Sequence, residues 1–338
     1  MDSVDLEVLK NSVKWLASGH KVVLVTVTKT WGSSPRPAGA MLALRDDGLV
    51  SGSVSGGCIE DDLIHRARNH TLTGAAPEAV TYGVSGDEAR KFGLPCGGTI
   101  QVVLEPLSDP APMQTLLEKL EQRELVARDL DMATGHSTFR PARADEALQF
   151  DGKRLVTIHG PRYRLIIVGA GQLSKFIAQI AQGLDYLVTV CDPRSEYNDL
   201  WDVAGVPLVR GMPDDVVAQM KPDAHTAVVT LTHDPKLDDM ALTEALKSDA
   251  FYVGAIGSRA NNKKRRERLK EFDLTEEQIA RLHGPIGLYI GSRTPPEIAI
   301  SILAEMTAYK NGVQLPAEVR VEVAKEARRE AMSPVCAT

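Results

Sequence analysis

The fold of the second half of this chain follows from one stretch of sequence, Arg164-Leu165-Ile166-Ile167-Val168-Gly169-Ala170-Gly171-Gln172-Leu173-Ser174. Its first part is an unbroken apolar run, which is typical of a strand buried on both faces of a parallel sheet. The glycines follow where a tight turn leads into a helix, and the pattern then predicts a helix through Ala181. This strand–turn–helix unit predicts a Rossmann fold.

The next predicted strand, Leu187 to Cys191, ends at Asp192, which lies 23 positions after Gly169. In a dinucleotide-binding fold, a carboxylate at this place bonds a ribose hydroxyl, while the glycine turn binds phosphate. We therefore expect Gly169, Gly171 and Ser174 to hold a phosphate and Asp192 to hold a ribose. Ser174 stands where a third glycine is usual, so the helix should pack less closely. The alternative is a Rossmann fold that binds no nucleotide.

Strands and helices continue to alternate after this unit. The pattern predicts strands at Thr226 to Leu231 and Phe251 to Val253, a helix at Leu237 to Leu246, two charged helices and an apolar helix at Pro296 to Tyr309. Such a series predicts a doubly wound parallel sheet. Thr232-His233-Asp234 follows the third strand, where His233 is a candidate general base. The alternative is that this tripeptide only caps the next helix.

The first half has a different pattern, which predicts an α+β domain. We expect helices or strands at residues 4–17, 22–28, 41–44, 49–54, 58–67, 79–82, 99–104, 112–121, 125–132 and 155–158. The best boundary is His159-Gly160-Pro161-Arg162. The predicted division is an N-terminal domain at 1–160, a Rossmann-like domain at 161–312, and a C-terminal helix and tail at 313–338.

Two cysteines lie beside glycine pairs, in Ser55-Gly56-Gly57-Cys58-Ile59-Glu60 and in Pro95-Cys96-Gly97-Gly98. Glycines allow backbone N–H groups to approach an anion, and a helix begins at Cys58, which favours its thiolate. Glu60 is expected to accept a hydrogen bond from the Gly57 N–H. Thiolates beside anion loops suit a sulfur-bound metal cofactor that carries a phosphate. The alternative is that Cys58 is an inert core residue.

The remaining candidates are weaker. Arg36, set between two prolines, is either an anion clamp or an ordinary surface arginine. Cys191 lies within a strand pattern and is expected in the core, and Cys336 lies in a polar tail.

Composition excludes several classes of protein. The chain has 338 residues, 43% of them hydrophobic and 25% charged, and a net charge of −6. The basic run Lys263 to Arg266 precedes Glu267 and is expected to be a solvated helix face, so nucleic acid is not an expected partner. No apolar run approaches the ~18 residues of a membrane span. The acidic N-terminus and four cysteines without disulfide or zinc spacing predict a cytoplasmic protein.

A series of motifs follows in a fixed order along the chain. These motifs are Gly32-Ser33-Ser34-Pro35-Arg36, Ser53-Val54-Ser55-Gly56-Gly57-Cys58-Ile59-Glu60, Gly93-Leu94-Pro95-Cys96-Gly97-Gly98, Val168-Gly169-Ala170-Gly171, Val190-Cys191-Asp192-Pro193-Arg194, Thr232-His233-Asp234, Tyr252-Val253-Gly254-Ala255-Ile256-Gly257-Ser258-Arg259 and Pro285-Ile286-Gly287-Leu288-Tyr289-Ile290-Gly291. The series resembles the XdhC/CoxI family of xanthine dehydrogenase accessory proteins over about residues 15–310.

The resemblance implies a chaperone of the molybdenum cofactor rather than an enzyme. Such a protein binds molybdopterin or its cytosine dinucleotide form, protects the sulfurated state, and inserts it into a molybdenum hydroxylase apo-enzyme. A cysteine desulfurase is the implied second partner, and a homodimer the implied assembly. The implied cofactor site comprises Ser33, Arg36, Ser55, Gly56, Gly57, Cys58, Glu60, Cys96, Gly97 and Gly98, with Cys58 and Cys96 as possible contacts to the metal. The alternative function, an NAD(P)-dependent oxidoreductase, depends on the glycine turn and Asp192.

Overall fold

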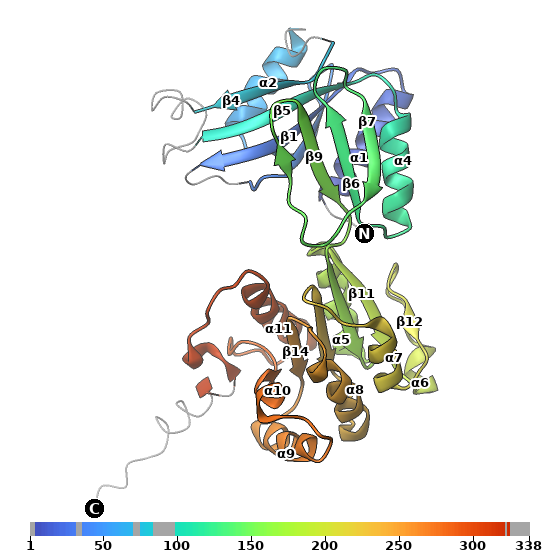
Figure 1. Ribbon diagram of the computed structural model, residues 1–338, viewed down its shortest axis with the longest axis vertical. Helices are drawn as coiled ribbons and strands as arrows, with labels where there is room; N and C mark the ends of the chain where they lie inside the picture. Colours follow the sequence, from blue (N-terminus) through green and yellow to red (C-terminus); the bar gives the residue numbers. More distant parts are fainter. Residues whose placement is uncertain (1–3, 32–35, 70–74, 84–98, 322, 325–338) are drawn as a thin grey trace, which may run out of the picture. The chain divides into compact units, whose positions relative to one another are not determined.

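The computed structural model describes residues 4–31, 36–69, 75–83, 99–321 and 323–324. The chain separates into two compact units, Met1–Pro161 and Arg162–Thr338, which Figure 1 shows in blue to green and in green to red. The division falls inside the stretch His159 to Arg162 that the sequence marks as a boundary.

The first unit combines helices with two antiparallel sheets. Its helices are α1 (Val4–Ala17), α2 (Cys58–Arg68) and α4 (Ala111–Glu121). The first sheet has the order β3-β2-β1-β5-β4, with strands Val50–Gly52, Met41–Arg45, Val22–Trp31, Thr99–Leu107 and Glu78–Tyr82. The second has the order β7-β6-β9-β8, with strands Ser137–Pro141, Val126–Asp131, Arg154–His159 and Gln149–Phe150.

Strand β1 explains why the first unit has a core on each side of its larger sheet. Val25 and Val27 point to a core that includes Ile59 of α2. Val22 and Leu24 belong to the opposite core, beneath α1 and α4. A β-branched run buried on both faces suits this central position, because successive side chains alternate between the faces.

The second unit is built on one parallel sheet, as the sequence predicts. The sheet has the order β12-β11-β10-β13-β14-β15, with strands Leu208–Val209, Tyr186–Cys191, Tyr163–Val168, Thr226–Thr230, Tyr252–Ala255 and Leu282–His283. Its helices are α5 (Gln172–Gly183), α6 (Ser195–Asn198), α7 (Pro213–Met220), α8 (Pro235–Lys247), α9 (Arg259–Lys270), α10 (Glu276–Ala280), α11 (Pro295–Lys310) and the 3-10 turn η1 (Ala317–Val319).

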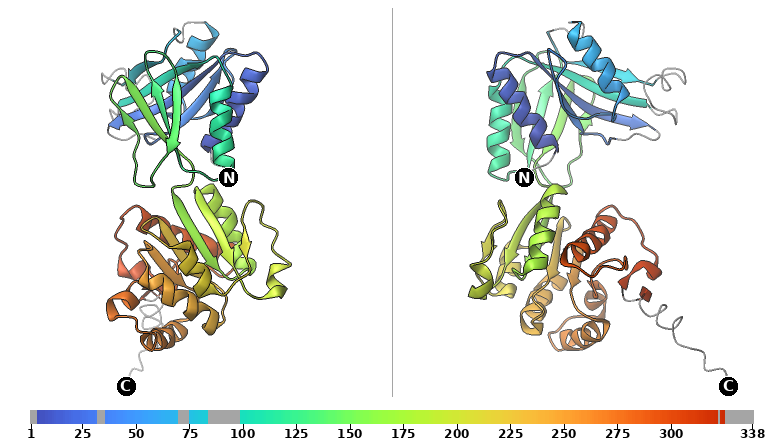
Figure 2. Two further views of the ribbon diagram at one scale, coloured as in Figure 1. Left: turned by 45° about the vertical axis from the view of Figure 1, so that its right-hand side comes forward. Right: turned by 180° about the vertical axis from the view of Figure 1, so that it is seen from behind.

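Helices cover both faces of this sheet, which confirms the doubly wound fold. Side chains of α5 and α11 pack on one face, and the view from behind in Figure 2 brings these two helices forward. Side chains of α7, α8, α9 and α10 pack on the other face. Because all six strands are parallel, their carboxyl ends share one edge, where open α/β sheets bind ligands.

Some elements differ from the sequence-based expectation. The polar segment between β6 and β9 contains the edge strands β7 and β8, and the two-residue strands β12 and β15 extend the parallel sheet. Most of the C-terminal helix and tail expected at 313–338 lies outside the described residues.

Candidate functional site

The glycine loop before α2 is folded around the carboxylate of Glu60. The backbone N–H groups of residues 54–56 donate to its Oε1 at 2.8–3.1 Å, and the Gly57 N–H donates to Oε2 at 2.9 Å. The hydroxyls of Ser53 and Ser55 donate to the same carboxylate. The expected bond between Glu60 and Gly57 is present. However, the loop N–H groups are not free for a phosphate, contrary to expectation, because Glu60 already takes them.

The electrostatics of this loop favour an ionised Glu60. Burial alone raises the pKa of a carboxyl group, but the hydrogen bonds from Ser55, Ser53 and the backbone outweigh it and lower the pKa of Glu60 to about 2. The charge is therefore held within the protein, at the first turn of α2, where the helix dipole also favours an anion.

The structure places only part of the predicted cofactor site in the first unit. Arg36 donates from Nε to the carbonyl oxygen of Ser53 at 3.1 Å, so it borders the Glu60 loop. Cys58 is the first residue of α2, as expected. Ser33 and the segment Cys96 to Gly98 lie outside the described residues. The convergence of Cys58 and Cys96 on one pocket stays a prediction.

The turn after β10 has the backbone of a Rossmann glycine turn. Gly169 has a φ of 108°, and a Cβ there would lie 3.0 Å from the Thr232 nitrogen, so the position requires glycine. Gly171 precedes α5 and has open space where a Cβ would stand. Ser174 is fully buried, and its hydroxyl has no hydrogen-bond partner among the residues that the structure describes. It therefore faces the protein interior rather than a ligand.

Asp192 lies where the sequence predicts it, at the end of β11, but it is fully buried. Its Oδ2 accepts the Ala170 N–H at 2.8 Å, and Arg194 donates to both carboxylate oxygens, at 2.9 and 2.8 Å. Burial raises the pKa of Asp192, but these hydrogen bonds outweigh it and lower the pKa overall. In this conformation the carboxylate is bound to the glycine turn and to Arg194, and neither of its oxygens is exposed to accept a hydrogen bond from a ribose.

Cys191, which precedes Asp192, is buried as expected. Burial raises the pKa of its thiol to about 12, so it stays protonated and inert.

The tripeptide after β13 is fixed by a buried carboxylate. Asp238 Oδ1 accepts the hydroxyl of Thr232 at 2.7 Å and its N–H at 3.2 Å. Asp234 caps α8 by accepting the Lys236 N–H at 2.9 Å, which is the capping role that the sequence offered as an alternative. His233 lies between them, exposed, with a φ of 61°.

A second buried network, which sequence reasoning missed, joins β14, β15 and α11. Glu305 accepts hydrogen bonds from the Tyr252 hydroxyl (2.5 Å) and the Gly287 N–H (2.7 Å), and its Oε1 lies 3.2 Å from His283 Nδ1. The His283 ring stacks on Tyr252 with the ring centroids 4.4 Å apart. The network fixes the loop after β15. Its residues are far apart in the sequence, so no local sequence pattern predicts their contact.

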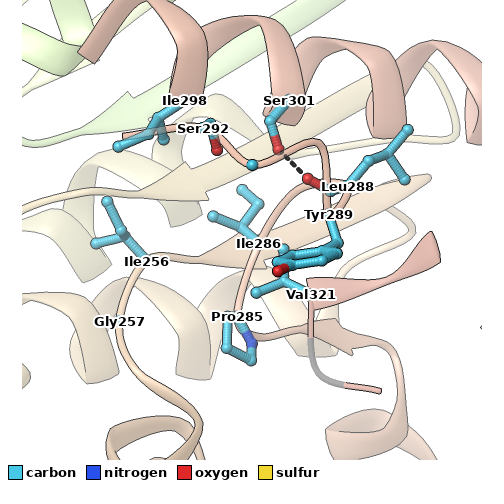
Figure 3. Close-up of a pocket in the computed structure, with 11 residues that line it drawn as sticks. Ile256, Gly257, Pro285, Ile286, Leu288, Tyr289, Ser292, Ile298, Ser301 and Val321 are labelled. Carbon is cyan, nitrogen blue, oxygen red and sulfur yellow. Dashed lines mark hydrogen bonds between the residues drawn. The ribbon is translucent and has the colours of Figure 1, made fainter. Parts of the chain in front are cut away.

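Two cavities adjoin at the carboxyl edge of this sheet, and they share Ile256 and Gly257, which follow β14. The first, which we call the apolar cavity, measures about 170 Å³ and includes Ile286, Tyr289 and Ile298 in its lining. Figure 3 shows the Tyr289 ring beside Ile286, with Val321 below it. The sequence marked these loops only as part of its family resemblance.

The second, which we call the cationic cavity, measures about 210 Å³ and lies between α9 and the start of α8. One helical face of α9 lines it through Asn261, Lys264, Arg265 and Arg268, and His233 lines it from the other side. The spacing of three, four and seven residues explains why these side chains share a face.

Comparison with known proteins bears on both units. The XdhC and CoxI family model matches residues 15–83, and the XdhC Rossmann domain model matches residues 165–306. The chain belongs to the XdhC and CoxI family. The resemblance seen in the motifs is thus confirmed.

Two curated proteins and one solved structure are similar to this chain over most of their length. The chain is 29% identical to the molybdenum cofactor insertion chaperone PaoD of Escherichia coli (strain K12), over 90% of this chain and 88% of PaoD. It is 26% identical to a protein of Bacillus subtilis (strain 168) named as a probable subunit of xanthine dehydrogenase, over 86% and 94%. A crystal structure described as a xanthine dehydrogenase from Bacillus halodurans superposes with a TM-score of 0.70 at 26% identity, over 93% and 97%.

Two kinds of feature are absent from the residues that the structure describes. No described helix is long and apolar enough to cross a membrane. No group of three or more His, Cys, Asp and Glu side chains within the described ranges is arranged to hold a metal ion.

Proposed function

We propose that this protein binds the molybdenum cofactor and inserts it into a molybdenum hydroxylase of the xanthine dehydrogenase type. The observation that carries the proposal is similarity across both units, over 90% of the chain, to a protein named as a molybdenum cofactor insertion chaperone. The second similar protein is named as a probable part of xanthine dehydrogenase, which favours that class of target.

The local chemistry suits holding a ligand better than transforming one. Around the cationic cavity, the charges of Asp238 and Asp239 are tied to Arg265 and Arg268 in ion pairs of 2.5–3.3 Å. Groups paired in this way are held in one geometry as part of the wall of the cavity, whereas acid–base catalysis needs a group that is free to exchange a proton with a substrate. We infer that the protein has no turnover of its own.

Several finer features belong to the same proposal. The cargo is molybdopterin or its cytosine dinucleotide form, and the protein protects the sulfurated state, with Cys58 and Cys96 as the candidate contacts to the metal. A cysteine desulfurase and the apo-hydroxylase are the partners, the protein acts as a homodimer, and it works in the cytoplasm. The place of Cys58 as the first residue of α2 supports this role, because the N-terminal end of a helix favours negative charge.

The test is purification from cells that make the cofactor, followed by measurement of pterin and molybdenum per chain. We expect both, and we expect the loaded protein to activate an apo-hydroxylase of the xanthine dehydrogenase type. A preparation that carries neither pterin nor molybdenum, and does not activate the hydroxylase when cofactor is supplied, rejects the proposal.

The alternative, an NAD(P)-dependent oxidoreductase, has less support. Its sequence argument needed Asp192 to receive a ribose, and the structure engages this carboxylate with Arg194 and Ala170 instead. Sustained oxidation of reduced nicotinamide by the pure protein would favour this alternative.

A further inference from the structure

We propose that the apolar and cationic cavities form one binding site for a phosphorylated aromatic heterocycle. The phosphate lies in the cationic cavity beside Lys264, and the ring lies in the apolar cavity among Ile256, Tyr289 and Ile298. None of the lining residues of the two cavities belongs to the Gly169 turn or to the Glu60 loop. The ligand class follows from the cavities; its identification with molybdopterin rests on the proposed function.

The charge balance of the cationic cavity favours an anion. Asp239 accepts from Arg268 at 2.5 Å and Arg265 at 3.3 Å, and Asp238 pairs with Arg265 at 2.9 Å. Lys264 is exposed and forms no ion pair with any residue that the structure describes. Its charge is therefore available to a ligand, while the neighbouring pairs hold the wall of the cavity in place. A phosphate is the anion class that a lysine in a preformed cavity commonly binds.

The backbone at His233 is a second and independent observation. Five non-glycine residues in the described part of the chain have positive φ. Four of them, Arg123, Asp185, Lys221 and Asp273, come shortly after helices end, where a left-handed residue is a usual stop.

His233 instead follows strand β13 and lines the cationic cavity. A left-handed conformation at such a position costs on the order of 1 kcal/mol and tends to be kept at ligand sites. The bonds from Thr232 to Asp238 hold the tripeptide in this conformation.

The apolar cavity supplies room for a ring. Ile256, Ile286, Ile298 and Tyr289 line this cavity, and Figure 3 shows the Tyr289 ring next to Ile286. An apolar lining with an aromatic ring suits a flat heterocycle better than a second charge. Each cavity alone is below the ~300–1,000 Å³ of a usual small-molecule site, so a ligand of ordinary size needs both. Ile256 and Gly257 line both cavities, and the proposed ligand passes beside them from one cavity into the other.

Binding of pterin probes to the full chain tests the phosphate half of the site. The probes are 6-hydroxymethylpterin and its phosphomonoester, followed by pterin fluorescence. Lys264→Gln should weaken binding of the phosphomonoester about tenfold, since it removes a charge-assisted contact, and should leave the unphosphorylated probe unchanged. Lys263→Gln is the matched control, because Lys263 is an exposed neighbour that does not line the cavity.

A second pair of variants tests the ring half. Ile298→Ala should weaken both pterin probes about fivefold, because it removes apolar contact with the ring. Ile300→Ala is the control, since Ile300 is exposed on the same helix and does not line the cavity. Melting temperatures of all four variants establish that they are folded.

The outcomes separate the site, its ligand and the proposed function. The site is rejected if the wild type binds no phosphorylated probe at millimolar concentration, or if each variant behaves like its control. Cytidine 5′-monophosphate and AMP form the nucleotide arm: tighter binding than the pterin phosphomonoester identifies a nucleotide site. If the wild type inserts the cofactor and Lys264→Gln binds the phosphorylated probe as tightly as the wild type, the proposed site is rejected and the proposed function stands. If the wild type binds the probes as expected but does not activate the hydroxylase, the proposed function is rejected and the site stands.

Discussion

Glu60 shows how one side chain changes the meaning of a glycine-rich loop. Its spacing of three residues from Gly57 is readable in the sequence as a helix-start signal, and that contact is present. What the spacing does not show is that the carboxylate also reaches residues 54–56. The glycine loop before α2 therefore does bind an anion, but that anion is the Glu60 side chain of the same protein.

Replacing Glu60 by glutamine should destabilise the protein by about 3 kcal/mol at pH 7. The folded pKa of about 2 lies below the ordinary value, so the ionised group stabilises the fold fully above about pH 4.5. This contribution is lost as the pH falls toward 2, so the gap between wild type and Glu60→Gln should narrow in acid. Urea unfolding at pH 7 and pH 3 measures it. Asp61→Asn, at an exposed neighbour, is the control; an equal loss there would mean that only helix charge matters.

Two buried serines should respond to alanine with opposite signs. Ser174→Ala should stabilise the protein by about 1 kcal/mol, because its buried hydroxyl has no hydrogen-bond partner within the described part of the chain. Ser301→Ala should destabilise it by about 1 kcal/mol, because its hydroxyl donates to the Leu288 carbonyl at 2.6 Å. Melting temperatures of the two variants decide this, and a loss of stability in Ser174→Ala contradicts the account.

At the scale of elements, the sequence predicts best where one pattern is long. The β10–turn–α5 unit is predicted because an apolar run, a steric need for Gly169 and a helical period agree. Strands β12 and β15 are only two residues long, and β7 is a mostly polar strand at the edge of its sheet. None of the three has a sequence pattern of its own, so they are recognised only by their pairing with a neighbouring strand. The cavities are missed for the same reason, since loops after β13, β14 and β15 build them jointly.

An ion pair couples the two sheets of the first unit. Glu105 of β5 and Arg128 of β6 are buried, and Arg128 Nη1 donates to Glu105 Oε2 at 2.9 Å. Arg128→Ala should lower the free energy of unfolding by about 3–5 kcal/mol, because it leaves the buried Glu105 carboxylate without its ion-pair partner.

The double variant Glu105→Leu/Arg128→Met should recover most of that loss, since apolar residues of similar size replace buried pairs well. Urea unfolding compares the three proteins. A double variant as unstable as Arg128→Ala would show that the pair contributes more than charge compensation.

For the whole molecule, we expect activation of the hydroxylase to depend on the amount of this protein. A chaperone stabilises a bound state and then releases it to a tighter acceptor, so with limiting cofactor its effect should saturate near one chain per cofactor. Titration into a fixed amount of apo-hydroxylase measures this. Full activation by a trace amount over many cycles would instead indicate an enzyme.

Small anions in solution compete with Glu60 for the N–H groups of the glycine loop. Glu60 is tethered within a few residues of the N–H groups that it fills. A tethered partner competes at an effective concentration in the millimolar range or above, whereas a free anion must be collected from solution. Inorganic phosphate or sulfate below that effective concentration therefore leaves the N–H groups bound to Glu60, and the shape of the loop does not depend on those anions.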